Sequence, residues 1–286
     1  MTAELAQRRL TVADIPAAVR LSAEPGWNQV PADWQLMIEH GDSFGHFTPD
    51  GRLVATGLTV PFSGRFGWIS MILVTAEFRR RGLATQSMRS CIDALMGRGI
   101  VPALDATPEG RQVYLPLGFK DVYRITRYFA ERPGSVDAPP PAAVTVRPMR
   151  EADVPAVSGY DAQPFGADRG FMLRHLLGRL PAGAHVAEGK GGIRGFVLGR
   201  GGRASTQIGP LVAKDAATAI ALLRAALAGI AGPVCIDLGN AHAAVIEAVT
   251  RASFTPQFPF IRMIHDRSEP FDDPQRVVAI AGPELG

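Results

Sequence analysis

Residues 74–84, Val-Thr-Ala-Glu-Phe-Arg-Arg-Arg-Gly-Leu-Ala, limit the folds open to this chain more than any other segment. The apolar run 69–74 predicts a buried strand, and apolar residues at helical spacing over 88–96 predict a helix directly after the turn. Such a turn leaves several backbone N–H groups without intrahelical acceptors, at the positive end of the helix dipole. Gly82 allows close approach to the backbone, and the arginines at 79–81 add positive charge. The segment therefore predicts a phosphate-binding turn.

Known phosphate-binding patterns narrow the kind of turn. A P-loop requires Gly-Lys-Ser/Thr, a dinucleotide-binding turn requires three glycines, and this segment matches neither. A second pattern follows downstream. Thr107-Pro108 predicts a helix with proline in its first turn, and this helix carries Tyr114 and closes at Leu-Gly118-Phe119. Two patterns in this order are more specific than either one alone.

Together the two patterns resemble the GCN5-related N-acetyltransferases (GNATs), whose loop reads Arg/Gln-x-x-Gly-x-Gly/Ala and whose second signature is a tyrosine followed by Gly-Phe. The resemblance implies an α/β fold with a mixed central sheet flanked by helices. It also implies acetyl-CoA, or another acyl-CoA, as co-substrate, and no metal ion. The pantetheine arm is expected along the strand end and the pyrophosphate on the turn. The expected cofactor-binding residues are Ile72, Leu73, Val74, Arg79, Arg80, Arg81, Gly82, Leu83, Ala84 and Thr107.

The resemblance gives Tyr114 the role of the acid that protonates the departing sulfur. A phenol with a pKa of about 10 stays protonated at neutral pH and can donate without tuning, although a buried aromatic is the alternative. Residues 67–74 contain no carboxylate where relatives often carry a glutamate, so the general base is open. The candidates are Glu24, His46, Asp105 or a water chain. A lone histidine is more often structural, and Asp105 could instead cap the following helix.

A proline-rich segment divides the chain. Residues 131–143 read Glu-Arg-Pro-Gly-Ser-Val-Asp-Ala-Pro-Pro-Pro-Ala-Ala and predict a semi-stiff linker. On either side of it, residues 8–17 reappear as residues 147–156, each time as a short strand and an Asp-x-Pro helix start. We therefore predict two tandem domains of the same fold. The predicted limits are an N-terminal domain over 1–132, a linker over 133–143, a C-terminal domain over 144–266 and a tail over 267–286.

The second half repeats the predicted fold but not the chemistry. Residues 212–218 have no glycine where the first half has its arginine-glycine turn, and roughly Val249 stands where Tyr114 stood. This half resembles the C-terminal domain of tandem GNAT proteins through two segments, Phe165-Gly-Ala-Asp-Arg169 and Ile208-Gly-Pro210. The resemblance predicts a degenerate second domain without a cofactor site. The tail receives no role.

The acceptor side is predicted from the segment between the first two helices. Trp27, Asn28 and Trp34 would supply flat apolar walls and a polar group, although a hydrophobic contact that closes a loop onto the sheet is the alternative. Asp168 is a further candidate. It could complete the acceptor pocket or the domain interface, or it could cap a helix in a purely structural half.

Composition sets limits on the class of protein. Apolar residues make up 47% of the chain, and the net charge of +3 is not the footprint of a nucleic-acid-binding protein. The two cysteines give no disulfide framework, and no signal peptide or membrane-spanning run of about 18 apolar residues is present. We expect a cytoplasmic N-acetyltransferase that acts on a primary amine of a small molecule or peptide. A non-catalytic acyl-CoA sensor is the alternative, and neither the acceptor nor the oligomeric state is predicted.

Overall fold

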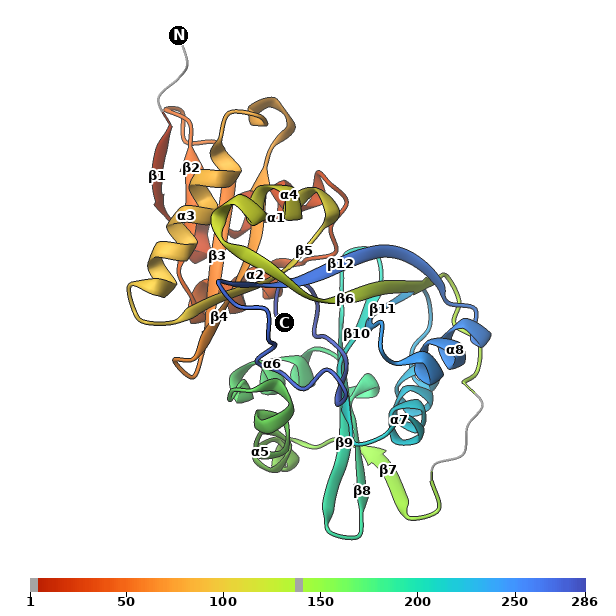
Figure 1. Ribbon diagram of the computed structural model, residues 1–286. Coiled ribbons are helices and arrows are strands. Elements are labelled where there is room, and N and C mark those ends of the chain that lie inside the picture. The colour runs from red at the N-terminus through yellow and green to blue at the C-terminus, as the bar shows by residue number, and fades with distance from the viewer. Residues whose placement is uncertain (1–4, 137–140) are drawn as a thin grey trace.

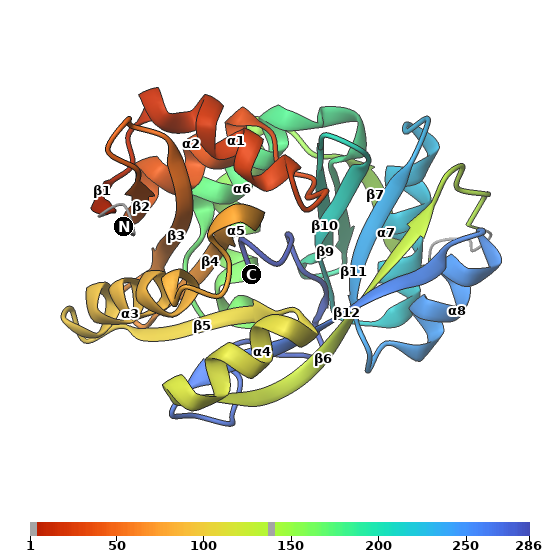
Figure 2. The same cartoon turned by 90° about the horizontal axis from the view of Figure 1, so that it is seen from above.

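The computed structural model describes residues 5–136 and 141–286, so part of the predicted linker, residues 137–140, lies outside it. The N-terminal half alternates strands with helices. Its elements are β1 (Ala6–Arg9), α1 (Ile15–Ala23), α2 (Pro31–His40), β2 (Ser43–Phe47), β3 (Leu53–Phe62), β4 (Phe66–Val74), α3 (Leu83–Met96), β5 (Val101–Ala106), α4 (Pro108–Tyr114) and β6 (Phe119–Ala130). Seen from above, α1 and α2 lie on one side of β3 and β4, and α3 lies on the other (Figure 2).

The C-terminal half repeats this order of elements, which confirms the prediction of two tandem α/β domains of one fold. Its elements are β7 (Val144–Pro148), α5 (Val154–Phe165), α6 (Gly170–Arg179), β8 (His185–Gly189), β9 (Gly192–Gly201), β10 (Thr206–Ala213), α7 (Ala216–Ala228), β11 (Val234–Gly239), α8 (Ala243–Arg251) and β12 (Thr255–His265), followed by the additional strand β13 (Val277–Ala279).

The two halves exchange their last long strands. The described strands form one 13-stranded sheet in the order β1-β2-β3-β4-β5-β12-β6-β11-β13-β10-β9-β8-β7. Strand β12 of the second half therefore lies beside β5 of the first, while β6 of the first half lies beside β11 of the second. Both strands cross the middle of the molecule side by side (Figure 1). The halves consequently share one continuous sheet.

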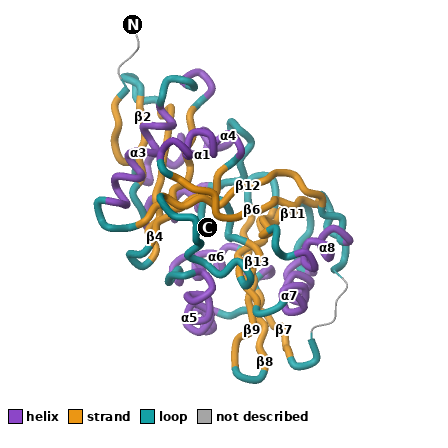
Figure 3. Tube along the Cα trace, in the orientation of Figure 1, coloured by secondary structure: helices purple, strands orange, loops and turns teal. Residues whose placement is uncertain are grey.

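The C-terminal segment, residues 267–286, runs back between the two halves as loop on either side of β13 (Figure 3). Although the sequence analysis gives this segment no role, its last ten residues are almost completely buried. Phe271 stacks on Phe66 of β4 with 4.6 Å between ring centroids. The indole Nε1–H of Trp68 donates to the carbonyl of Pro283 at 3.0 Å. Arg169 donates to the carbonyl of Gly286, also at 3.0 Å.

Two glycines of the second-half motifs make room for this segment. A Cβ atom at Gly166 would lie 2.3 Å from the carbonyl oxygen of Phe271, and one at Gly209 would lie 1.9 Å from that of Ile280. Both distances are far below van der Waals contact, so a side chain at either position would displace the segment. The glycines of the Phe-Gly-x-Asp-Arg and Ile-Gly-Pro segments are thus explained by packing, because each leaves room for the backbone of residues 267–286.

Candidate active site

An opening in the sheet lies between β4 and β5. The two parallel strands pair from Phe66–Val101 to Trp68–Ala103 and then separate, while β12 pairs along the opposite edge of β5. A positive φ of 53° at Met71 and a register shift against β3 accompany the divergence. The edge of β4 that faces β5 is therefore unpaired beyond Trp68 within the described residues. The predicted contacts Ile72, Leu73 and Val74 lie on this stretch, where an extended ligand with amide groups could pair as an added strand.

The N-terminus of α3 adjoins this opening. Gly82 is its N-cap in the left-handed conformation, with φ 80° and ψ 0°, and no atom lies within 4 Å of where a Cβ would stand. Helical hydrogen bonding begins with Gln86 N–H donating to the Gly82 carbonyl at 3.0 Å. The N–H groups of Leu83, Ala84 and Thr85 consequently have no intrahelical acceptor. The turn therefore has the open space and the free donors that an anion requires.

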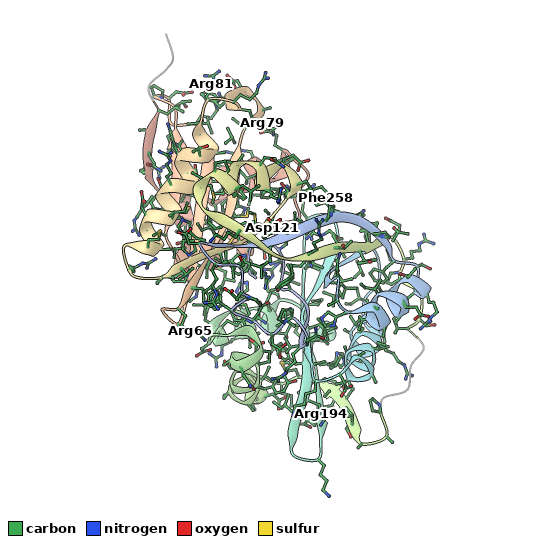
Figure 4. The ribbon with its side chains drawn as sticks, in the orientation of Figure 1. Arg65, Arg79, Arg81, Asp121, Arg194 and Phe258 are labelled. Carbon is green, nitrogen blue, oxygen red and sulfur yellow. The ribbon has the colours of Figure 1, made fainter. Side chains whose placement is uncertain are left out.

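The three arginines of the turn do not act as one patch. Arg79 donates from Nε to the Val74 carbonyl at 3.1 Å and lies 3.7 Å from Glu24. Arg81 donates to the Glu77 carbonyl at 3.0 Å and stacks on Phe78, with its Cζ 4.7 Å from the ring centroid. Arg79 and Arg81 lie together at the outer end of the N-terminal half (Figure 4). Arg80 has a positive φ of 60° and an exposed side chain.

Tyr114 ends α4 on the same face of the sheet as α3. It packs in one hydrophobic cluster with Ile72 and Cys91. A Cβ at Gly110 would lie 3.2 Å from its hydroxyl oxygen, and this hydroxyl has no hydrogen-bond partner among the described residues. Burial raises the pKa of Tyr114, so the phenol is protonated at neutral pH. The hydroxyl of Thr107 accepts a hydrogen bond from Gly110 N–H at 3.0 Å and so caps α4. This hydroxyl therefore has a structural role.

The three side-chain candidates for the general base are either hydrogen-bonded to other residues or buried. Glu24 accepts from the Thr75 hydroxyl and the Ala76 N–H, both at 2.7 Å, and the Thr75 bond lowers its pKa. His46 is buried in β2, where burial lowers its pKa. Both oxygens of Asp105 accept from Arg262 at 2.9 Å, and burial raises the pKa of Asp105. Glu24 and Asp105 thus have hydrogen-bond partners, whereas Nε2 of His46 has none within the described part of the chain, and these contacts assign no general base.

Two of the predicted acceptor residues have other roles. Trp34 is 0% exposed and donates to the Ser22 hydroxyl at 3.3 Å, so it is a core residue and not a pocket wall. Asn28 accepts from Ala204 N–H at 2.8 Å and donates to the Ser205 carbonyl at 3.0 Å. It therefore joins the N-terminal half to the β9–β10 turn.

The neighbouring residue Trp27 serves the same contact between the halves. Its carbonyl accepts from Arg203 Nε at 2.9 Å, and its partly buried ring packs against the core. The segment predicted as an acceptor pocket is therefore largely a contact between the two halves of the molecule.

Asp168 begins α6. Its Oδ1 accepts from Gly170 N–H at 2.7 Å and from the Ser158 hydroxyl at 3.0 Å. The bond to Gly170, the first residue of the helix, agrees with the alternative in which Asp168 caps a helix. Its backbone N–H donates to the hydroxyl of Ser63 in the β3–β4 turn at 3.0 Å, so the residue also lies at the contact between halves. The adjacent Arg169 is buried and forms a two-point ion pair with Asp161 at 2.7 and 3.0 Å.

The equivalent opening in the second half is filled. Strands β10 and β11 pair only from Thr206–Val234 to Ile208–Ile236, and β13 then enters between them. Ala279 pairs with Leu211 on one side and with Leu238 on the other. At the start of α7, Asp215 accepts from Thr218 N–H at 2.8 Å and places a carboxylate where an anion would sit. The chain's own strand thus occupies the second opening.

Sequence reasoning missed a buried polar cluster on the face of β4 and β5 that lies opposite α3 and Tyr114. Arg262 of β12 pairs with Asp105 and with Asp272 of the C-terminal segment, and the Tyr123 hydroxyl donates to Asp272. The guanidinium stacks on Trp68, 4.5 Å from the ring centroid. Nothing in the sequence around Asp272 marks it, because its partners are brought together only by the strand exchange.

The structure thus contains one fold twice in tandem, with an open gap between the strands in the first half and a filled one in the second. Residues 14–119 match a family model described as "Acetyltransferase (GNAT) family", and residues 157–279 match one described as "Acetyltransferase (GNAT) domain". The chain belongs to the GNAT family and carries two GNAT domains in tandem. In the part of the chain that the structure describes, no group of three or more potential ligand side chains could hold a metal ion, and no helix has the length and apolarity to cross a membrane.

Known proteins are similar over most of the chain. The "Uncharacterized N-acetyltransferase YitH" of Bacillus subtilis (strain 168) is 23% identical over 245 residues, which are 84% of each protein. A putative acetyltransferase from Pyrococcus horikoshii has a TM-score of 0.75 at 22% identity, covering 99% of this chain and 96% of that one. A tandem GNAT protein from the clavulanic acid biosynthesis pathway has a TM-score of 0.63 at 14% identity, covering 91% and 98%. The two structures support the fold.

Proposed function

We propose that this protein is an acyl-CoA-dependent N-acyltransferase whose N-terminal half holds acetyl-CoA, or another acyl-CoA, and transfers the acyl group to a primary amine of a small molecule or peptide. The difference between the two openings carries this proposal. The opening at β4 and β5 has an unpaired strand edge and a helix N-terminus with free donors, whereas the one at β10 and β11 holds β13. One cofactor site per chain follows. The domain limits 1–132 and 144–266 remain a prediction.

The residues around the first opening suit the parts of acyl-CoA. The backbone of Ile72 to Val74 would pair with the amides of the pantetheine arm. The N–H groups of Leu83 and Ala84 would bind the pyrophosphate, with Arg80 free to add charge. The amine nitrogen would form a bond to the thioester carbon while the C–S bond breaks and its electrons leave on sulfur. Tyr114 would protonate that sulfur, because the raised pKa of its phenol keeps the hydroxyl in the neutral form.

Replacing Tyr114 by phenylalanine separates this proposal from the alternative of a non-catalytic acyl-CoA sensor. For an enzyme, we expect kcat for amine-dependent release of coenzyme A to fall about 100-fold, since general acid catalysis contributes at least that much. The affinity for acetyl-CoA should stay within about twofold, because the backbone contacts do not involve the hydroxyl. Thiol release with a panel of primary amines gives kcat, and calorimetry gives the affinity.

Tyr160→Phe is the matched control, since its hydroxyl donates to the Arg194 carbonyl in the second half at 2.8 Å and lies outside the proposed site. This variant should keep wild-type turnover. Wild-type protein that binds acetyl-CoA but releases no thiol with any amine would instead favour the sensor.

A further inference from the structure

A small cavity lies on the face of the sheet opposite α3. Its volume is about 10 Å³, enough for one water-sized group. The rings of Phe66, Trp68, Phe165 and Phe271 line it, together with the polar side chains of Arg262 and Asp272. Phe271 is partly exposed and stacks on Phe66, so it forms the outer wall. The cavity is thus lined by aromatic rings, one carboxylate and one guanidinium.

The cavity adjoins the point where β4 and β5 separate. Trp68 and Ala103 both line it, and they are the last paired residues of the two strands. Trp68 packs in the core cluster that includes α1 and α2, whereas the next residue, Ile69, packs with α3 and Tyr114. The cavity therefore adjoins the opening on the face opposite Tyr114.

The charges around the cavity do not balance. Arg262 donates to both oxygens of Asp105 at 2.9 Å and to Oδ2 of Asp272 at 2.5 Å, and Tyr123 donates to the same Oδ2. Burial raises the pKa of Tyr123, so this phenol is neutral. Two carboxylates consequently share one guanidinium. A buried excess charge is costly unless a counter-charge or a proton relieves it.

Asp272 has one oxygen to spare. The residue is 9% exposed, and both hydrogen bonds that it accepts from the described residues go to its Oδ2. Asp105, in contrast, has both oxygens engaged by Arg262 and does not line the cavity. Aromatic rings attract a cation through their faces. Charge, hydrogen-bonding capacity and lining all favour a small cation beside Asp272.

We propose that this cavity binds the ammonium group of the acceptor and that Asp272 accepts its proton, an assignment that rests on the proposed function. Proton transfer from R–NH₃⁺ to the Asp272 carboxylate gives the neutral amine and a carboxylic acid. The amine nitrogen then bonds to the thioester carbon, the C–S electron pair leaves on sulfur, and the thiolate takes a proton from Tyr114. The second nitrogen proton and the proton on Asp272 both leave to water, and the phenolate takes one proton back from water, so the cycle releases one proton in net. The small volume selects an unhindered primary amine.

The test uses ethylamine as the probe and compares Asp272→Asn with Asp237→Asn. Asp237 is a second buried carboxylate, paired with Arg127 at 2.7 Å, and it does not line the cavity. With wild-type protein, ethylammonium chloride at ten times its Kd should raise Tm by about 3 °C. Tetramethylammonium chloride at the same ionic strength should not, because it is too large for the cavity. Asp272→Asn should lose the ethylammonium effect, and Asp237→Asn should keep it.

Turnover provides the second measurement. Asp272→Asn should lower kcat/KM for ethylamine about 100-fold, and Asp237→Asn should stay within about threefold. Both variants should bind acetyl-CoA as wild type does. If Asp272→Asn does not fold, Asp272→Glu keeps the charge while its extra methylene fills the cavity, and it should likewise lose the ethylammonium effect.

Three results would overturn the assignment: no stabilisation of wild type by ethylammonium, equal stabilisation by tetramethylammonium, or equal losses in the two asparagine variants. A protein that fails to bind acetyl-CoA would instead contradict the proposed function, so the two failures can be told apart.

Discussion

Arg147 and Asp153 form a two-point ion pair at 2.7 and 2.9 Å, and the Asp153 Oδ2 also accepts from Arg150 N–H at 2.8 Å. Arg8 and Asp14 repeat this geometry in the first half, with both contacts at 2.8 Å. In each case a strand is tied to the start of the following helix. The repeat seen in the sequence at these positions therefore corresponds to the same local structure in both halves.

The pH dependence of stability should report this ion pair. The Arg147 hydrogen bond lowers the pKa of Asp153 from 3.8 to about 2, so ionised Asp153 stabilises the fold above about pH 4, and this contribution disappears as the pH falls to about 2. We expect Asp153→Asn to lower the free energy of unfolding by about 1 kcal/mol at pH 7 and by almost nothing at pH 2. Urea unfolding at several pH values measures the difference.

Glu247→Gln is the control for that measurement, because its carboxylate is 69% exposed and pairs only along one helix. This variant should change stability by less than about 0.5 kcal/mol. An Asp153→Asn penalty that persists unchanged at pH 2 would contradict the role given to the ion pair.

Individual side chains also mark the limit of sequence reasoning. The turn at Gly82 could be predicted because its conformation and donors depend on neighbouring residues. The roles of Trp34 and Asn28 could not, since burial and partners depend on distant parts of the chain: Asn28 binds residues 204 and 205. Asp272 is the extreme case, because its partners Arg262 and Tyr123 come from two exchanged strands.

At the scale of elements, the strand exchange is the main departure from a simple pair of domains. Periodicity predicts helices and strands because it is local, and the predicted strand over 69–74, the helix over 88–96 and the helix from Pro108 are all present. Strand pairing is non-local, so the sequence could not tell that β12 would lie between β5 and β6. The same limit hid β13, a three-residue strand in a proline-rich segment.

The exchange predicts that neither half folds alone. Residues 1–132 would lack β12 beside β5, and residues 144–286 would lack β6 beside β11, which leaves long unpaired edges in each piece. We expect each piece to be insoluble or unfolded by circular dichroism when produced separately, and soluble when both are produced together. The intact protein should unfold in one transition. Two independent transitions, or a folded N-terminal piece, would show that the exchange is dispensable.

At the scale of the whole molecule, one fold is used in two ways. The first half keeps its sheet opening accessible, and the second fills its own with β13. The same C-terminal segment then continues to Trp68 and contributes Asp272 near the first opening. The sequence shows that the second half lacks the loop glycine, but only the structure shows that β13 fills the gap between β10 and β11.

A calorimetric titration with acetyl-CoA tests the central claim most directly. We predict one site per chain, with affinity at least tenfold weaker in Gly82→Asp, where a carboxylate would enter the proposed phosphate position. Gly99→Asp is the matched control, since Gly99 also has a positive φ of 70° and open space around it but lies beyond the far end of α3. It should bind as wild type does. Two sites per chain, or unchanged binding by Gly82→Asp, would contradict a single cofactor site in the N-terminal half.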